Sequence, residues 1–226
     1  MTVKITWLSH AAFLIESDKY RLLIDPFLRG NPVAEMHPEN IGKIDGIIIT
    51  HGHGDHVGDT IDIARKTGAL CISNVEICSW LRRNGVLKTH GQQPGGWFTH
   101  PFGRVRLTPA IHGSQLPDGT PGGIATGVVV EIEGKRIYHA GDTALFSDMK
   151  LIGNLGIDAA LLPAGSNFTM DAEDLLFAAD LLQPGLIIPM HYDTWDLIKA
   201  DLSVLGSKNS SNHRFEIIQI SSSVTL

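Results

Sequence analysis

Residues 51–56, which read His-Gly-His-Gly-Asp-His, constrain the fold of this chain more than any other segment. They place three imidazoles and one carboxylate directly after the apolar run at 45–50. Side chains that bind a divalent metal ion must converge from a short, stiff piece of backbone, and the end of a buried strand provides one. Gly52 and Gly54 let the chain turn tightly between the polar residues. The pattern predicts a metal site; the alternative is a solvated polar loop.

The composition is that of an ordinary globular protein. The 226 residues are 43% hydrophobic and 19% charged, which suits one domain spanning residues 1–226 with a substantial core. The net charge of -6 argues against a broad basic face, so we expect a small-molecule substrate and no nucleic-acid partner. A nuclease is not excluded on this ground, because metal ions can supply positive charge.

Cys71 and Cys78 are the two cysteines of the chain, and they form neither a CxxC pair nor a disulfide framework. Each lies among apolar neighbours, as buried free thiols usually do. We therefore expect a reducing compartment and a cytoplasmic protein. Neither a signal peptide nor an apolar stretch of membrane-spanning length is recognisable, so no membrane partner is expected. A homo-oligomer is compatible with the sequence.

Alternating and continuous apolar runs predict a chain in which strands precede helices, twice over. This order predicts an α/β (α+β) protein with two mixed β-sheets packed face to face and helices on the outer faces. Strands are expected at 3–8, 12–16, 21–24, 45–50, 69–73, 104–110, 127–133, 136–139, 159–163, 186–190 and 214–220. Helices are expected at 57–66, at 75–83 after the capping residue Asn74, at 170–182 after Thr169 or Asp171, and at 195–205.

Two segments rich in glycine and proline, at 92–97 and 116–123, are too polar and too broken for the core. Loops of this kind beside a metal site could serve as substrate lips. Plain surface connections are the alternative.

His112, Asp142 and His191 repeat the pattern of the first motif. Each follows an apolar run and precedes a small or turn-forming residue. A lone histidine after a strand is usually structural, but three such sites beside the first motif favour a shared crevice at the strand ends.

Together these residues suffice for two divalent metal ions, with zinc favoured and iron or manganese also suited to the ligands. Two ions close together lower the pKa of a bridging water and polarise the scissile bond. One ion would be held by His51, His53 and His112, the other by Asp55, His56 and His191, with Asp142 as the bridge.

The ligand order HxHxDH, His, Asp, His resembles that of the metallo-β-lactamase superfamily, and the likeness covers nearly the whole chain. The closer resemblance is to its uncharacterised metal-dependent hydrolase branch, related to ascorbate-6-phosphate lactonase. Residues 7–10 (Trp-Leu-Ser-His), 23–27, 137–143, 167–170 and 188–192 carry it. One departure is Pro-Ala-Gly-Ser at 163–166, where the branch tends to have Pro-Ile-Gly; it bears on substrate choice and not on the metals.

The resemblance implies a four-layer αββα sandwich with a dinuclear site and hydrolysis of an ester, lactone or phosphoester. His10 matches the branch motif and either faces the active site as a catalytic residue or is a structural histidine. Asp25 either accepts a hydrogen bond from a ligand imidazole or merely begins a turn. His139 is expected to support its strand, and Asp59 to begin the following helix.

The remaining polar and aromatic candidates have weaker signals. Asn167 and Thr169 could contact substrate, although Thr169 could instead cap the following helix. Tyr192 and Trp195 follow His191 and are expected to pack, with pocket lining as the alternative. Four histidines in polar contexts are expected on the surface: His37, His90, His100 and His213.

Three functions remain open at this stage. The first is a metal-dependent hydrolase in which Asp55 orients a metal-bridged hydroxide; no Gly-x-Ser-x-Gly nucleophile motif is present. The second is an iron-dependent redox enzyme on the same scaffold, resembling a sulfur dioxygenase. The flavin-linked diiron relatives have Glu where this chain has His53. The third, a binding module with a decayed site, conflicts with the complete ligand set.

Overall fold

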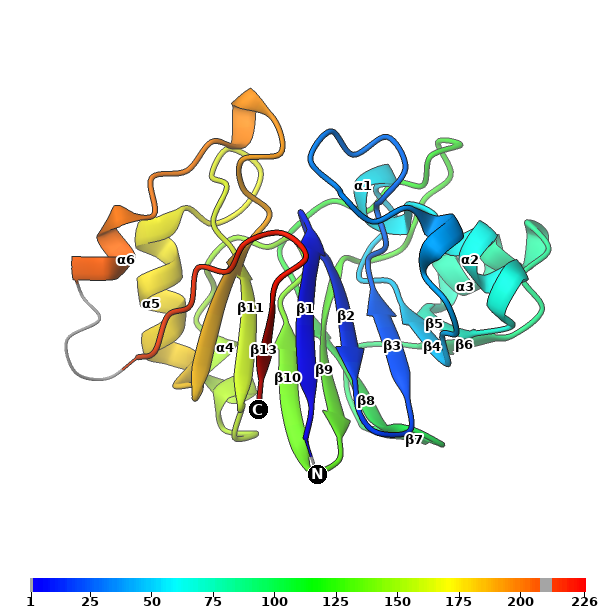
Figure 1. Cartoon of the computed structure of the whole chain (residues 1–226), viewed down its shortest axis with the longest axis horizontal. Helices are drawn as coiled ribbons and strands as arrows, with labels where there is room; N and C mark the ends of the chain where they lie inside the picture. Colours follow the sequence, from blue (N-terminus) through cyan, green and yellow to red (C-terminus); the bar gives the residue numbers. More distant parts are fainter. Residues whose placement is uncertain (1, 208–212) are drawn as a thin grey trace.

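Two β-sheets pack face to face, and helices cover both outer faces (Figure 1). This computed structural model describes residues 2–207 and 213–226. The arrangement is the αββα sandwich expected from the sequence.

The first sheet has seven strands in the order β13-β1-β2-β3-β4-β5-β6. β1, β2 and β3 form an antiparallel meander, β3 to β6 are parallel, and β13 adds antiparallel to the free edge of β1. The bounds are β1 (Lys4–Ser9), β2 (Ala12–Glu16), β3 (Arg21–Ile24), β4 (Gly46–Ile48), β5 (Leu70–Asn74), β6 (Thr89–Gln92) and β13 (Ser223–Thr225).

The second sheet has six strands in the order β12-β11-β10-β9-β8-β7. β10, β11 and β12 are parallel, whereas β7 to β10 alternate in direction. The bounds are β7 (Phe98–His100), β8 (Gly103–Pro109), β9 (Thr126–Ile132), β10 (Lys135–His139), β11 (Ala159–Pro163) and β12 (Leu186–Met190).

Both faces of the sheets are buried, which explains the continuous apolar runs in the sequence. Along β2, Phe13 and Ile15 point into the core between the sheets, while Leu14 points to the helices outside. Along β12, Ile188 belongs to the central core and Ile187 to the outer core of the second sheet. The sandwich therefore has one inner and two outer hydrophobic layers.

Helices α2 (Thr60–Thr67) and α3 (Val75–Arg83) cover the first sheet, and α4 (Met149–Gly153) and α5 (Ala172–Leu182) cover the second. The Asn74 side chain accepts a hydrogen bond from the Ile77 backbone N–H and caps α3, as expected. Of the two predicted starting residues of α5, Asp171 is the cap, because its carboxylate accepts from the N–H groups of Glu173 and Asp174. No helix in the described ranges is long and apolar enough to cross a membrane.

Strand direction places many polar residues at one edge of the sandwich. β1, β3 and β4 run in the same direction, because β2 is antiparallel to both β1 and β3 and β4 is parallel to β3. β8, β10 and β12 also share one direction, because β9 is antiparallel to both β8 and β10 and the strands β10, β11 and β12 are parallel. The loops that follow these six strands gather at the upper edge in Figure 1, where the short helix α1 (Gly54–Val57) also lies.

Three expected elements differ in the structure. The helix expected at 57–66 is divided into α1 and α2 at Gly58, whose φ of 43° and close approach to the Pro26 carbonyl exclude a side chain. The helix expected at 195–205 is a 3-10 turn, Asp196–Ile198, followed by α6 (Ser203–Ser207). At 214–220 the structure has only an isolated bridge between Ile187 and Phe215 instead of a strand.

His100 is also placed differently from expectation. It is buried, and its ring stacks on Phe102 with centroids 5.2 Å apart and lies 4.9 Å from the His90 ring. The expectation of a surface position was wrong because β7 turns this side chain inward, between the edge strands of the two sheets.

Candidate metal centre

The predicted ligands converge at the edge where the strands end. His51, His53, Asp55 and His56 follow β4, and the other three follow β8, β10 and β12. Their ligand atoms form three groups, with all atoms of each group within 4.8 Å of one another. The groups are His10, Asp55, His56 and His191; His51, His53 and His112; and His51, His56 and Asp142.

Asp142 lies at the centre of the cluster. Its carboxylate oxygens are 3.0 Å from His191 Nε2, 3.3 Å from His56 Nε2, 3.5 Å from His112 Nε2 and 3.9 Å from His51 Nε2. The residue is only 2% exposed. A carboxylate in this position can bind on both sides, as a bridge between two metal ions requires.

One side of the cluster is open to solvent. His51 Nε2 lies 3.0 Å from His53 Nδ1, and the rings of both lie close to His112. His51 is buried, whereas His53 and His112 are half-buried. The cluster is therefore more accessible at His53 and His112 than at His51.

Asp25 fixes the orientation of two ligand imidazoles from behind. His56 Nδ1 donates to Asp25 at 2.7 Å, and the Thr50 hydroxyl donates to the same carboxylate at 2.6 Å. The Thr50 oxygen lies 3.0 Å from His51 Nδ1 and accepts its proton. In its neutral form each histidine thereby presents an unprotonated Nε2 to the cluster, the arrangement usual for metal-binding histidines.

The donor set fits a metal ion in a further respect. Several buried atoms have no hydrogen-bond partner in the described part of the chain: His56 Nε2, both ring nitrogens of His191, and Asp142 Oδ1. Buried polar atoms without partners are costly, by about 1–3 kcal/mol each. Imidazole nitrogens and carboxylate oxygens around one point are the ligands of zinc and related ions.

Burial and mutual charge shift the ionisation of these groups. Burial lowers the pKa of His51 well below its ordinary value. For Asp142, burial acts to raise the pKa, but His191 and His56 hold it well below the usual range. Burial likewise opposes protonation of His56, yet Asp142 and Asp25 raise its pKa well above the ordinary value. Asp142 therefore stays charged although it is buried, and it favours a positive group beside it.

His10 is an eighth member of the cluster. Its Nδ1 is 2.8 Å from the Thr194 hydroxyl, and its Nε2 is 3.2 Å from Asp55 Oδ2. Phe27 and Trp195 contact the ring from the loops above, with centroids at 5.9 and 5.0 Å. Burial first and His191 second lower the pKa of His10 to about 4, so the ring is neutral at pH 7.

Three of the site residues have a left-handed backbone conformation although none is glycine. The φ angles are 52° at His10, 45° at Asp25 and 55° at His191. Each costs roughly 1–2 kcal/mol relative to a right-handed conformation. Such strain is common at functional sites, and here it occurs where three strands end in the cluster.

Other candidates lie outside the ligand groups. His139 Nε2 donates to the Ala11 carbonyl and its Nδ1 accepts from Gly141 N–H, which supports the strand end as expected. Asp59 precedes α2 but makes no side-chain cap; its carboxylate accepts from the N–H groups of Leu28 and Arg29. Asn167 is exposed in the loop before α5.

Sequence reasoning missed three supporting hydroxyls: Thr50, Thr194 and Ser114. The hydroxyl of Ser114 accepts from Gly52 N–H and donates to Gly122, which ties the 116–123 loop to the first motif. Only Thr50, directly before His51, had a signal in the sequence. The 92–97 loop instead packs on β8 through the hydrogen bond from Gly95 N–H to the Leu107 carbonyl.

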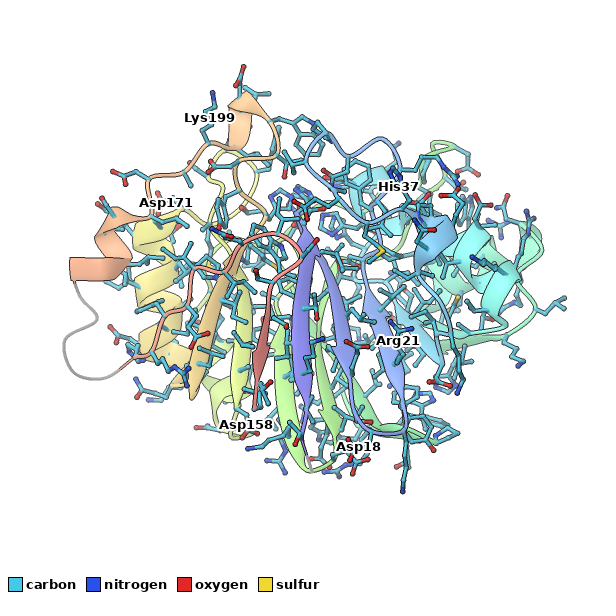
Figure 2. The ribbon with its side chains drawn as sticks, viewed as in Figure 1. Asp18, Arg21, His37, Asp158, Asp171 and Lys199 are labelled. Carbon is cyan, nitrogen blue, oxygen red and sulfur yellow. The ribbon has the colours of Figure 1, made fainter. Side chains whose placement is uncertain are left out.

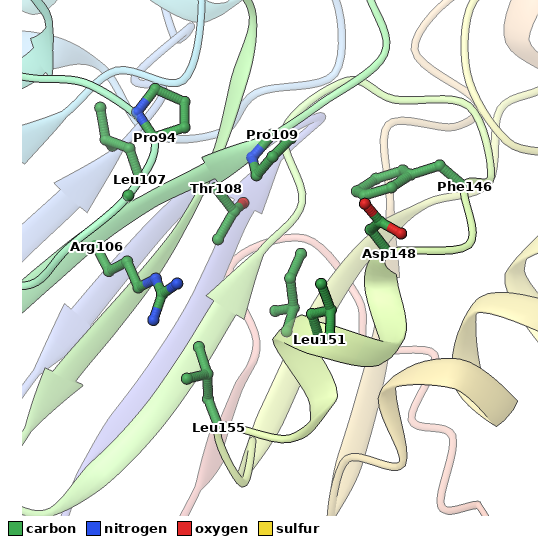
Figure 3. A pocket seen from close by; sticks show the side chains of 11 residues that line it. Pro94, Arg106, Leu107, Thr108, Pro109, Phe146, Asp148, Leu151 and Leu155 are labelled. Atoms are coloured by element: carbon green, nitrogen blue, oxygen red, sulfur yellow. The ribbon is translucent and has the colours of Figure 1, made fainter.

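One hollow formed by the described residues adjoins the cluster, and another lies apart from it. A cavity of about 740 Å³ has His10, Trp7 and Tyr192 in its wall. The other, of about 230 Å³, lies between β8 and α4, with Arg106 and Asp148 facing it (Figure 3). None of the predicted ligands lines this second hollow.

Comparisons with known proteins agree with this geometry. The "Beta-lactamase superfamily domain" family matches residues 20–192. A UPF0173 metal-dependent hydrolase of Desulfitobacterium hafniense is 48% identical over 206 residues, covering 88% of this chain and 87% of its own. One from Thermus thermophilus is 47% identical over 201 residues, with 88% of each chain covered.

A solved structure is similar throughout. The metallo hydrolase Igni18 from Ignicoccus hospitalis matches with a TM-score of 0.88 and 36% identity, covering 100% of this chain and 99% of that one. The fold and the His/Asp cluster thus define a metallo-β-lactamase-type protein. This chain belongs to the metallo-β-lactamase superfamily and is a metal-dependent hydrolase similar to the UPF0173 proteins. The expected relation to ascorbate-6-phosphate lactonase stays a prediction.

Proposed function

We propose that this hydrolase uses two divalent metal ions, with zinc preferred, and cleaves an ester, lactone or phosphoester. The observation that carries the proposal is the position of Asp142, within 3.9 Å of imidazole nitrogens on both sides of the cluster. Relatives described as metal-dependent hydrolases support it.

In this proposal His51, His53 and His112 would hold one ion, Asp55, His56 and His191 would hold the other, and Asp142 would serve both. Bound ions of this kind lower the pKa of water to near neutral and polarise the scissile bond. Asp25 and Thr50 keep the ligand imidazoles in the required tautomer.

His10 and Asp55 act as a pair next to the substrate. A carboxylate only accepts, so His10 Nε2 donates to Asp55 Oδ2 and His10 Nδ1 accepts from Thr194. Asp55 is held in one orientation and can accept a proton from an attacking water. Burial disfavours its charge, but the hydrogen bond from His10 and the charge of His56 keep the pKa of Asp55 below its ordinary value.

Metal content tests the proposal. We expect about two ions per chain by mass spectrometry of protein purified without chelator, and one or fewer in Asp142→Ala. His37→Ala, at an exposed histidine, is the matched control and should keep two. Little metal after reconstitution with zinc or manganese contradicts the proposal, and a single iron per chain favours the redox alternative.

A further inference from the structure

The cavity beside the metal centre is mostly apolar. Trp7 and Tyr192 stack in its wall with centroids 5.4 Å apart, and Leu202, Ile217 and Ile220 extend the apolar surface. His10 belongs both to this wall and to the metal-ligand group with Asp55, so the cavity and the centre adjoin at this residue. Its volume of about 740 Å³ is typical of small-molecule sites.

The charged side chains that line this cavity are acidic. They are Glu35 and Asp193, and no lysine or arginine is among the described lining residues. An anionic group entering the cavity would lose water without gaining a positive partner, which is unfavourable. The lining therefore suits an uncharged group.

The loops around the centre have the same charge character. We call residues 26–37, 112–124, 143–148, 164–171 and 191–202 the rim loops. Their lysine and arginine residues are Arg29 and Lys199. Arg29 is paired with Glu39, Asp59 and Asp62, and Lys199 is paired with Asp196 at 2.7 Å. Lys199 and Asp171 are both seen at this upper edge in Figure 2. The rim thus offers no unpaired cation to a phosphate group.

Large apolar side chains are exposed on the rim loops and directly beside them. Ile111, next to His112, is 57% exposed, Phe168 is 52% exposed and Trp195 is 38% exposed. Thr143 anchors the segments that carry Ile111 and Phe168 beside Asp142. Its hydroxyl accepts a hydrogen bond from Ile111 N–H, and its carbonyl accepts one from Met170 N–H. Exposed apolar groups around a polar site often mark contact with an apolar ligand.

We propose that the substrate is an uncharged ester or lactone whose apolar arm occupies the cavity beside His10. The inference rests on the proposed hydrolase function and selects among its substrate classes. The water oxygen bonds to the acyl carbon and the carbon–oxygen bond to the alcohol breaks. Of the two protons of the water, one goes to the departing alkoxide and the other to solvent. The products are a carboxylate and an alcohol, and the acidic rim repels the carboxylate, which favours its release.

A series of p-nitrophenyl esters tests the arm. From butyrate to octanoate, kcat/KM should rise roughly three- to fourfold per methylene, the value for burial of one such group. p-Nitrophenyl phosphate and bis(p-nitrophenyl) phosphate should react at least a hundredfold more slowly than the octanoate. Equal or faster phosphoester hydrolysis, or rates independent of acyl length, would overturn the inference.

Ala200→Trp fills the cavity from a half-buried wall position outside the metal ligands. We expect it to remove the preference for octanoate and to keep kcat/KM for p-nitrophenyl acetate within twofold of the value for the unsubstituted protein. Leu87→Trp, at a 95% exposed leucine that does not line the cavity, is the control and should change neither. Ile217→Asp, at a 54% exposed lining residue, gives a second test with little risk to folding. An unchanged octanoate preference in both cavity variants contradicts the inference.

Binding of 2-decanone, an uncharged ketone with no bond to hydrolyse, separates this inference from the proposed function. Calorimetry should show binding to the metal-loaded protein and at least tenfold weaker binding to Ala200→Trp. If the ketone binds in this way but neither esters nor phosphoesters are cleaved, the proposed function fails and the cavity assignment stands. If esters are cleaved without length dependence and the ketone does not bind, the cavity assignment fails and the proposed function stands.

Discussion

Two clusters of imidazoles in the described part of the chain have different chemistry. In the metal centre, His51, His56 and His191 surround Asp142, and among the described residues several of their nitrogens have no hydrogen-bond partner. In the second cluster, His90 and His100 lie between Phe98 and Phe102, and neither ring is paired with a carboxylate in the described residues. Both clusters lie where the two sheets meet.

The difference shows that burial of histidines does not by itself make a metal site. In the aromatic cluster, burial first and His90 second lower the pKa of His100 to about 4, so this ring is neutral at pH 7. The metal centre also contains carboxylates, which raise the pKa of His56 and favour positive charge beside them. Charge complementarity, set by Asp25, Asp55 and Asp142, distinguishes the cluster that could hold metal from the aromatic cluster.

The strongest test replaces one histidine from each cluster. His191→Ala should lose about one ion per chain and reduce hydrolysis at least about a hundredfold, beyond the usual effect of losing an outer partner. His100→Ala should keep two ions and its activity within about twofold, while lowering the free energy of unfolding. Metal analysis, kinetics and urea unfolding measure these effects. Loss of metal in His100→Ala would erase the distinction between the clusters.

Asp25→Asn tests the carboxylate behind the ligands. Removing its charge should weaken metal binding about 10- to 100-fold, because His56 loses the partner that fixes its tautomer. The matched control is Asp59→Asn, at a buried aspartate that accepts backbone hydrogen bonds near the same edge. It should reduce stability without changing the metal dissociation constant, measured by competition with a chelator. Equal weakening in both variants would contradict the role of Asp25.

Acid should distinguish the aromatic cluster by its effect on stability. Because the pKa of folded His100 is about 4, the unfolded chain binds a proton below about pH 6.5 that the folded chain excludes. As the pH falls from 6.5 to 5, His100 therefore lowers the free energy of unfolding by about 1.5 kcal/mol. In His100→Phe this part of the pH dependence should vanish from urea unfolding curves. An unchanged slope would place the imidazole in contact with water.

Cysteine reactivity gives the smallest expected effect. Burial raises the pKa of Cys71 to about 12 and that of Cys78, whose thiol lies beside the His90 carbonyl, to about 11. At pH 8 both thiols should react with Ellman's reagent far more slowly than the unfolded chain does. Rapid labelling of Cys78 in the native protein would show that the aromatic cluster opens readily.

Much of the fold was predictable because both sheet faces are buried. Four strands, at 12–16, 21–24, 159–163 and 186–190, have the predicted bounds, since long apolar runs leave few alternatives. The helix expected at 195–205 was wrong because Asp193 closes a loop there: its carboxylate accepts from Ala200 N–H and its N–H donates to the Ile198 carbonyl. The segment at 217–220 lines the cavity instead of extending a sheet.

The seven predicted ligands come together because strand ends are visible in sequence and strand direction follows from short connections. The supporting residues were harder to find. Thr194 reaches His10 across 184 positions of sequence, and nothing near it marks this contact. His100 was misplaced because a polar neighbourhood in sequence does not reveal which side of an edge strand faces inward.

The gathering of strand ends at one edge has a mechanical consequence. His51 and His56 follow a strand of one sheet, whereas Asp142 and His191 follow strands of the other. An ion bound to all of them joins the two layers much as a crosslink would, although it can be withdrawn. The stability of the whole sandwich should then vary with the free metal concentration. Chelation should speed amide hydrogen exchange along the facing strands of both sheets.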